Sequence, residues 1–193
     1  MLNWPNFLMY LVVTAITPGP NNIMSMSNGG RLGFKKALPF NLGIWVAVSV
    51  ISVVSTLFCS ILSSIMPKIM FPMLILGASY MLYLAWKTFK STSEIDEKHS
   101  KSDFFSGFTL QFVNAKLYIY CIVSIEAYIL PYYAGQVGPL FGFALFIAFI
   151  GFSATLCWSA FGSIFKVFFS KYAKITNTIM ALLLIYCAVS LFY

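Results

Sequence analysis

Six consecutive residues interrupt a long apolar run, 7–26, that otherwise has the composition of a membrane-spanning helix: Thr17-Pro18-Gly19-Pro20-Asn21-Asn22. The two prolines lack an N–H and break the helical hydrogen-bond ladder, and the glycine lets the chain bend between them. Lipid cannot satisfy unpaired backbone groups, so such a break should be buried in protein or line a polar cavity. This placement indicates transport.

The break also supplies groups that bind anions. Pro20 suits the first position of a new half-helix, whose free N–H groups and positive dipole end favour a carboxylate. Asn21 and Asn22 add amide donors and acceptors, while Pro18 and Pro20 leave the carbonyls of Thr14 and Ile16 without their usual donors. A simple proline kink is the alternative. The six residues are therefore expected to contribute to a substrate site.

A second polar group lies in the apolar run 107–131. Lys116 is about 15 Å along a helix from Ser106, at about 1.5 Å per residue. Burying it would cost at least about 2.5–3.5 kcal/mol. The alternative to burial is that the Lys116 side chain extends to the cytoplasmic interface. A buried Lys116 would pair with a substrate carboxylate or change protonation during transport, with Gln111 and Asn114 lining the same place.

Glu126 is the only acidic residue within an apolar run, near its outer end. It is a candidate coupling or gate group, and an interfacial glutamate that reaches water is the competing interpretation. The chain has one histidine, His99, in a polar stretch, and four cysteines without metal-site spacing. No metal or cofactor is expected. No nucleophile–base pair is evident, so an enzyme is not expected either.

The composition is that of a membrane protein. The 193 residues are 60% hydrophobic and 9% charged, with a mean hydropathy of +0.87. Apolar stretches of about 20 residues predict membrane-spanning helices, and six fill almost the whole chain: 6–28, 38–64, 69–89, 107–131, 138–165 and 174–193. The prediction is an all-α membrane protein, one transporter domain over 1–193. Small residues are expected to allow close helix packing: Gly43, Ala47, Gly77, Ala78, Gly138, Gly142 and Gly151.

The net charge of +7 does not indicate nucleic-acid binding, because its distribution follows the predicted spans. Basic residues follow the first, third and fifth spans: Arg31, Lys35, Lys36, Lys87, Lys90, Lys98, Lys101, Lys166, Lys171 and Lys174. Lys68 opposes this pattern. The positive-inside rule then places both termini outside the cytoplasmic membrane and the basic loops in the cytoplasm.

A polar cytoplasmic linker, 91–106, divides the chain into repeats of three spans each, 1–90 and 107–193. An odd number of spans gives the repeats opposite orientations, which is common in secondary transporters. Each repeat begins with an interrupted helix, the first at 17–22 and the second at 111–116. Interrupted segments at matching positions are typical of a transport site.

These residues resemble the LysE/RhtB family of amino-acid exporters. The resemblance covers essentially the whole chain and is carried by Thr17 to Asn21, Gly29 to Gly43, and the stretch Leu76-Gly77-Ala78-Ser79-Tyr80-Met81-Leu82-Tyr83-Leu84-Ala85-Trp86-Lys87. It implies proton-coupled export of small amino acids or their derivatives across the cytoplasmic membrane. The two inverted repeats predict that export proceeds by alternating access.

Three segments are most similar to the cysteine/O-acetylserine exporter branch: Gln111 to Lys116, Cys157-Trp158 and Leu182 to Val189. Many family members carry Asn-Pro-Lys in the fourth span, where this chain has Ala115 in place of proline. The second break is therefore expected to form without proline, with Asn114 and Lys116 retained. Export of homoserine, threonine or a lysine-like substrate is the nearest alternative.

The sequence thus predicts an exporter with a small amino acid, membrane lipid and a coupling proton as partners, and it leaves a homodimer open. Thr17, Pro18, Gly19, Pro20, Asn21, Asn22, Gln111, Asn114 and Lys116 are the expected substrate-binding residues. A channel, a membrane-embedded enzyme and a non-transporting assembly partner are the competing classes.

Overall fold

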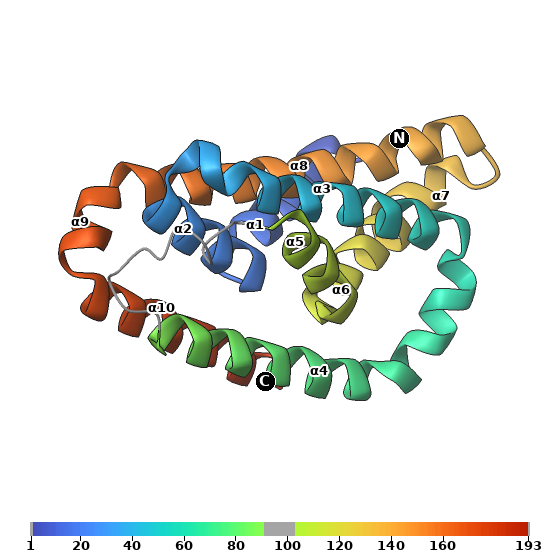
Figure 1. Ribbon diagram of the computed structural model, residues 1–193. Coiled ribbons are helices and arrows are strands. Elements are labelled where there is room, and N and C mark those ends of the chain that lie inside the picture. Colours follow the sequence, from blue (N-terminus) through green and yellow to red (C-terminus); the bar gives the residue numbers. More distant parts are fainter. Residues whose placement is uncertain (1, 91–102, 193) are drawn as a thin grey trace.

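The computed structural model describes residues 2–90 and 103–192, and all regular structure within them is helical (Figure 1). The first half contains α1 (Trp4–Ile16), α2 (Pro20–Leu32), α3 (Phe34–Leu57) and α4 (Cys59–Lys90). The second half contains α5 (Phe104–Leu110), the 3₁₀ turn η1 (Gln111–Val113), α6 (Ala115–Val123), the π-helix η2 (Ser124–Ile129), α7 (Leu130–Tyr133), α8 (Val137–Ile164), α9 (Lys166–Lys171) and α10 (Ala173–Ser190).

Both predicted helix interruptions are confirmed. Helix α1 ends at Ile16, and α2 begins at Pro20 after an extended Gly19. In the second half, α5 and η1 are separated from α6 by Asn114, and the two segments are bent by 70° relative to each other. This second break forms without a proline, as Ala115 predicts.

Among the described residues, four helical segments are long and apolar enough to cross a membrane: Phe34–Leu57, Lys68–Lys90, Val137–Ile164 and Ala173–Ser190. The bent pair Phe104–Val113 and Ala115–Tyr133 would be a fifth crossing. The predicted span 6–28 is divided between α1 and α2. The boundary between the second and third predicted spans also differs, because the chain turns at Phe58 rather than after residue 64. No proline or glycine marks that turn.

The predicted linker 91–106 falls largely outside the described residues, which include 103–106. Asp103 is the N-cap of α5, where its carboxylate accepts a hydrogen bond from the Phe105 N–H at 3.2 Å. Helix α5 therefore begins at Phe104, three residues before the predicted start of the second repeat. An acidic residue at this position stabilises a helix N-terminus.

Two groups of helices are visible in Figure 1. Helices α3 and α8 pack along one another, with α2 against α8 and α5 against α3. Helices α4 and α10 pack together along the other side of the molecule. The interrupted helices thus contact the long helix of the opposite half of the chain, which brings the two breaks together.

Glycines determine the closest contacts between these helices. A Cβ on Gly29 of α2 would overlap the Ser159 carbonyl of α8, and one on Gly162 would overlap the Met26 carbonyl of α2. On the other side of the bundle, α3 and α5 make the same kind of paired contact: Gly43 against Phe104 and Gly107 against Phe40. Small residues allow this approach of backbones.

The predicted packing role is confirmed for Gly43 and also for Gly77, which contacts the Val113 carbonyl. It is wrong for Gly138, Gly142 and Gly151, because a Cβ at each would have nothing within 4 Å. These three glycines lie on α8, where the sequence pattern alone does not show which face meets a neighbour.

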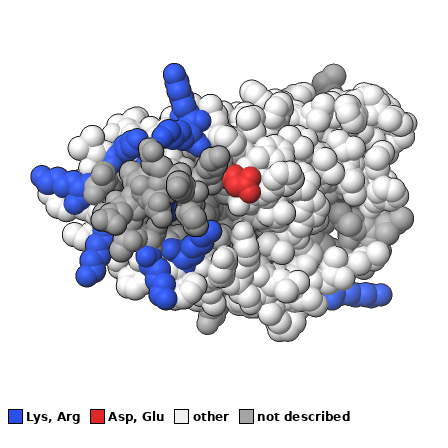
Figure 2. Space-filling view, viewed as in Figure 1, with Lys and Arg blue, Asp and Glu red and all other residues white. Residues whose placement is uncertain are grey.

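Basic side chains gather at the end of the molecule that holds α9 (Figure 2). Arg31 lies in the last turn of α2, Lys90 in the last turn of α4 and Lys171 in the last turn of α9. Lys98 and Lys101 are outside the described residues. The N-terminus lies toward the opposite end (Figure 1). The charges are thus concentrated at one end of a largely apolar body.

The glycine contacts predict a difference between two alanine substitutions. Gly29→Ala should lower the melting temperature of the purified protein in detergent, because the new methyl group overlaps backbone and overpacking costs about 1–3 kcal/mol. Gly142→Ala is the matched control on the open face of α8 and should leave the melting temperature nearly unchanged. Equal melting temperatures for the two variants would contradict this packing.

Candidate functional site

A cavity lies where the two helix breaks meet. It is lined by Thr14, Ala15, Gly19, Pro20, Asn21, Asn22, Ile44, Val48, Asn114, Lys116, Leu117, Tyr120, Gly151 and Thr155. It holds about 60 Å³ of water-accessible space. This is well above the about 10–15 Å³ that a cavity needs to hold a single water. The cavity therefore suits a small solute, with polar groups at the breaks and apolar walls from α3, α6 and α8.

The broken end of α1 is closed by side chains in place of backbone donors. The Asn22 amide donates to the carbonyls of Ala15 at 2.7 Å and Thr17 at 3.0 Å. The Trp158 indole N–H of α8 donates to the Ile16 carbonyl at 3.1 Å. Ile16 is the carbonyl whose amide donor is lost because residue 20 is proline. Trp158 thus supplies the hydrogen bond that Pro20 cannot.

Three predicted amide side chains form one network across the two breaks. The Asn21 amide donates to Gln111 Oε1 at 2.8 Å and accepts from Gln111 Nε2 at 3.0 Å. Asn114 Nδ2 also donates to Asn21 Oδ1, at 3.3 Å. Gln111 is fully buried and donates in addition to the Gly107 carbonyl at 3.0 Å. The network fixes the start of α2 against the second break.

Lys116 reaches from the second break to the first. Its ammonium donates to the Thr17 carbonyl at 3.0 Å, and its side chain passes close to Gly19, where a Cβ would lie 3.3 Å from Nζ. Lys116 is half-buried and lines the cavity. The positive dipole end of α2 begins at Pro20 beside it. Two sources of positive potential therefore meet at one wall of the cavity, which favours an anion there.

Acidic side chains do not neutralise this wall within the described residues. The two that are described are Asp103, which caps α5, and Glu126, which is exposed in η2. Neither lines the cavity. Neither of these two carboxylates therefore pairs with Lys116 at the cavity.

The structure brings most of the predicted site residues to the cavity, with three exceptions. Thr17 and Pro18 are exposed and do not line it, and the Thr17 hydroxyl donates to the Val13 carbonyl at 2.5 Å. Gln111 lies behind the wall and acts through Asn21. Lys116 does not extend away to an interface, because its ammonium is bound at the first break.

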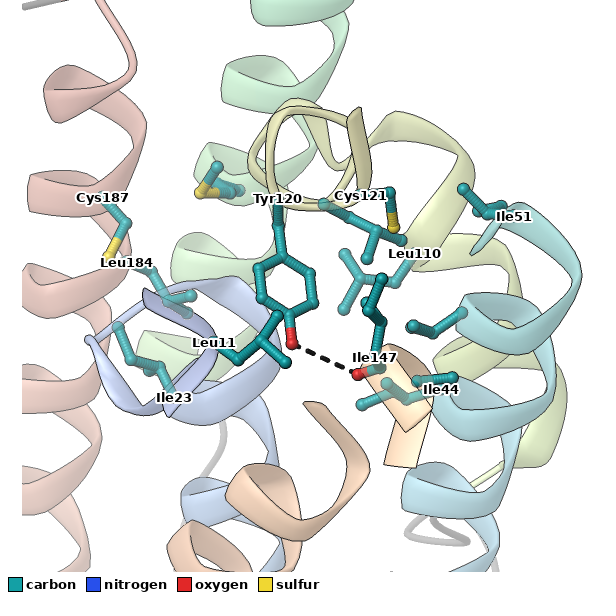
Figure 3. Close-up of a cluster of buried hydrophobic side chains, with 14 of the residues drawn as sticks. Leu11, Ile23, Ile44, Ile51, Leu110, Tyr120, Cys121, Ile147, Leu184 and Cys187 are labelled. Atoms are coloured by element: carbon teal, nitrogen blue, oxygen red, sulfur yellow. Dashed lines mark hydrogen bonds between the residues drawn. The ribbon is translucent and has the colours of Figure 1, made fainter. Parts of the chain in front are cut away.

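Tyr120 is a cavity residue that the sequence analysis missed. Its ring is packed among fully buried side chains, including Leu11, Ile44 and Leu184, and its hydroxyl donates to the Ile147 carbonyl of α8 at 3.2 Å (Figure 3). Tyr120 follows Lys116 by four residues and so shares its helix face. Plotting the face of Lys116 on a helix would have found it.

Aromatic rings connect the cavity wall with the end of the molecule near the N-terminus. Tyr10 stacks on Tyr120 at 6.3 Å and on Tyr128 at 5.5 Å between ring centroids. Phe7 contacts Tyr128 at 5.6 Å and Phe143 at 6.0 Å. Tyr128 belongs to the π-helix η2, and π-helical turns are frequent at functional sites. The rings fill the space on this side of the cavity.

Comparison with known proteins gives the family. A model of the LysE type translocator family matches residues 12–193 of the chain. The chain belongs to the LysE family. This family places it among membrane transport proteins, not enzymes, in agreement with its long apolar helices.

Curated relatives within this family are similar over almost their whole length. The cysteine/O-acetylserine efflux protein of Salmonella choleraesuis (strain SC-B67) is 34% identical over 97% of this chain and 96% of the relative. The protein of the same name from Escherichia coli (strain K12) is 32% identical over the same shares of the two chains. No solved structure matches the chain. The resemblance read from the sequence is thus confirmed.

The Trp158 contact predicts that loss of the indole N–H lowers the stability of the protein even when an aromatic ring is kept at residue 158. Trp158→Phe keeps an aromatic side chain but leaves the Ile16 carbonyl, at the exposed surface of the helix bundle, without this donor. Apolar chains around the bundle cannot replace the donor, so the unpaired carbonyl is costly. The melting temperature of the detergent-purified protein should fall. Trp45→Phe is the control, because phenylalanine can keep the stack of residue 45 on Phe152. An equal effect of the two substitutions would contradict the capping role.

Proposed function

We propose that this chain exports small amino acids across the cytoplasmic membrane by binding them at the junction of the two helix breaks. The observation that carries the proposal is the wall formed by Lys116 and the N-terminus of α2. It offers an ammonium and a positive dipole end to a solute, without a carboxylate among the described lining residues. The carboxylate of an amino acid matches this wall in charge.

The substrate class follows from the cavity and the relatives. The cavity has room for a small solute, and the relatives are named for efflux of cysteine and O-acetylserine. We infer the same class for this chain, with homoserine, threonine and a lysine-like amino acid as the alternatives. A lysine-like substrate is the weakest fit, because its second ammonium would find no carboxylate among the described lining residues.

Binding would change the hydrogen bonds at the breaks. In the structure, Lys116 donates to the Thr17 carbonyl and so links the second break to the first. A substrate carboxylate accepts a stronger, charge-assisted hydrogen bond from the same ammonium. Its arrival would draw Lys116 away from Thr17 and loosen this link. Substrate binding and movement of one half against the other would thereby be coupled.

Alternating access between two inverted repeats, 1–90 and 107–193, fits this arrangement. Helix α1 and helix α2 pack on α8, whereas α5 and α6 pack on α3, and α4 packs on α10. Exchanging the repeats preserves this set of partners, as an inverted repeat requires. With six spans and a cytoplasmic basic end, both termini lie outside.

The cavity would then have a gate on either side. The close glycine contacts of Gly29 with Ser159 and of Gly107 with Phe40 would hold the cytoplasmic side. The stack of Tyr10 on Tyr120 and Tyr128 would close the outer side. Opening one side while the other stays packed exposes the cavity to one compartment at a time.

Removing the charge of Lys116 should weaken recognition of the carboxylate. In proteoliposomes, Lys116→Gln should raise the concentration of cysteine needed for half-maximal uptake at least about tenfold, because hydrogen bonds to charged groups contribute about 1.5–3 kcal/mol. Inhibition by cysteamine, which lacks the carboxylate, should change little. Lys87→Gln is the control at the basic end of α4. If cysteine uptake by Lys116→Gln matched the wild type at equal protein content, the assigned role would be wrong.

Proton coupling is a separate part of the proposal. Uptake of labelled cysteine into proteoliposomes should saturate with cysteine concentration and should accelerate when a pH gradient is imposed across the membrane. A channel would instead give uptake that does not saturate in the same range. Saturable uptake at a rate that does not depend on the pH gradient would support a carrier but contradict coupling to protons.

A further inference from the structure

Asn114 has a buried oxygen with no hydrogen-bond donor. The residue is 5% exposed, lines the cavity and occupies the break between η1 and α6. Its Oδ1 is unpaired in the structure. An unsatisfied buried acceptor is costly, so such a group in a native protein calls for a partner.

The orientation of this amide follows from the network around it. The Gly107 carbonyl can only accept, so the atom of Gln111 that faces it is Nε2. Gln111 Oε1 then accepts from Asn21 Nδ2, which leaves Asn21 Oδ1 to accept from Asn114. Asn114 must therefore present Nδ2 to Asn21, and its oxygen is the atom left over. Reversing the amide would place two oxygens together.

The Gly107 carbonyl, which does not line the cavity, fixes the orientation of the three amides. The group that would pair with Asn114 Oδ1 must be a hydrogen-bond donor, because an amide oxygen only accepts. Asn114 is the N-cap of α6, Lys116 follows two residues later, and both residues line the cavity. In an α-amino acid, the ammonium and the carboxylate are attached to one carbon. A carboxylate on Lys116 would thus bring its own ammonium into the cavity that Asn114 also lines.

We propose that Asn114 Oδ1 is the acceptor for the α-ammonium group of the substrate, and that it selects α-amino acids against other small carboxylates. This inference rests on the proposed function. Asn21 and Gln111 are positioning residues in it, because they keep the oxygen of Asn114 turned away from the amide network. Lys116 alone would bind any small carboxylate of suitable size, whereas the pair Asn114 and Lys116 recognises both charges of a zwitterion.

The test compares cysteine with 3-mercaptopropionate, which has the same thiol and carboxylate but no ammonium. Stabilisation of the purified protein against heat, measured over a range of ligand concentrations, gives an affinity for each compound. The wild type should bind cysteine at least about tenfold more tightly, since a site that is left with an unpaired buried group rejects the analogue. In Asn114→Leu, the affinity for cysteine should fall to that for 3-mercaptopropionate. The affinity for 3-mercaptopropionate should stay at its wild-type value.

Two further variants keep the comparison informative. Asn114→Ala replaces the leucine variant if that one does not melt cooperatively. Asn6→Leu removes an exposed amide on α1 and should keep wild-type values for both compounds.

Equal weakening of both compounds in Asn114→Leu would show a merely structural role and overturn the proposal. An unchanged preference for cysteine in Asn114→Leu or Asn114→Ala would overturn it as well. The failure of the proposed function looks different, because the wild-type protein would then bind and transport neither cysteine nor O-acetylserine, whatever residue 114 is.

Discussion

The break at Thr17 to Gly19 imposes the constraint on which the rest of this structure depends. A helix that stops within an apolar bundle exposes carbonyl groups that lipid cannot satisfy. Here the donors are side chains: Asn22 of the following helix α2, and two that are distant in the sequence, Lys116 of α6 and Trp158 of α8. The packing of α2 on α8 and the approach of the second break are the means by which these donors arrive. The same groups form the polar part of a cavity whose other walls are apolar.

The Thr17 carbonyl has a role both in the stability of the break and in the proposed transport cycle. It accepts from both Asn22 and Lys116, so one carbonyl joins the two halves of the chain. The bond from Asn22 is local and can persist through a transport cycle. The bond from Lys116 spans the two breaks, and a carboxylate competes for it. A cycle built on this exchange would need no large reorganisation of the amide network of Asn21 and Gln111.

The sequence predicts the parts of this site that arise from local chemistry. Pro18 and Pro20 cannot continue a helix, and a lysine within an apolar run must find a partner, so the first break and the importance of Lys116 follow directly. The polar residues Gln111, Asn114 and Lys116 predict the second break, although Ala115 stands where a proline would mark it. The family likewise follows from contiguous residues. Each of these inferences depends on neighbours along the chain.

Other features depend on neighbours in space and could not be predicted. Nothing in the sequence shows that Trp158 would face Ile16, or that Gly29 rather than Gly142 would meet another helix. The turn at Phe58 has no proline or glycine, so the apolar pattern runs through it and misplaces the boundary. Thr17 and Pro18 belong to the interrupted segment 17–22 but lie on its exposed side, and only the residues on its other side line the cavity.

The central claim is that the substrate occupies the cavity between the breaks, and protection from alkylation tests it directly. Val48 lines the cavity on α3, and Val50 lies on the exposed side of the same helix. Each is changed to cysteine in a background from which the native cysteines are removed, and the rate of reaction with a small thiol reagent is measured. O-acetylserine carries no thiol and does not consume the reagent. We expect it to slow the reaction of Val48→Cys and not that of Val50→Cys. Equal rates with and without O-acetylserine at position 48, in protein that transports it, would contradict the account.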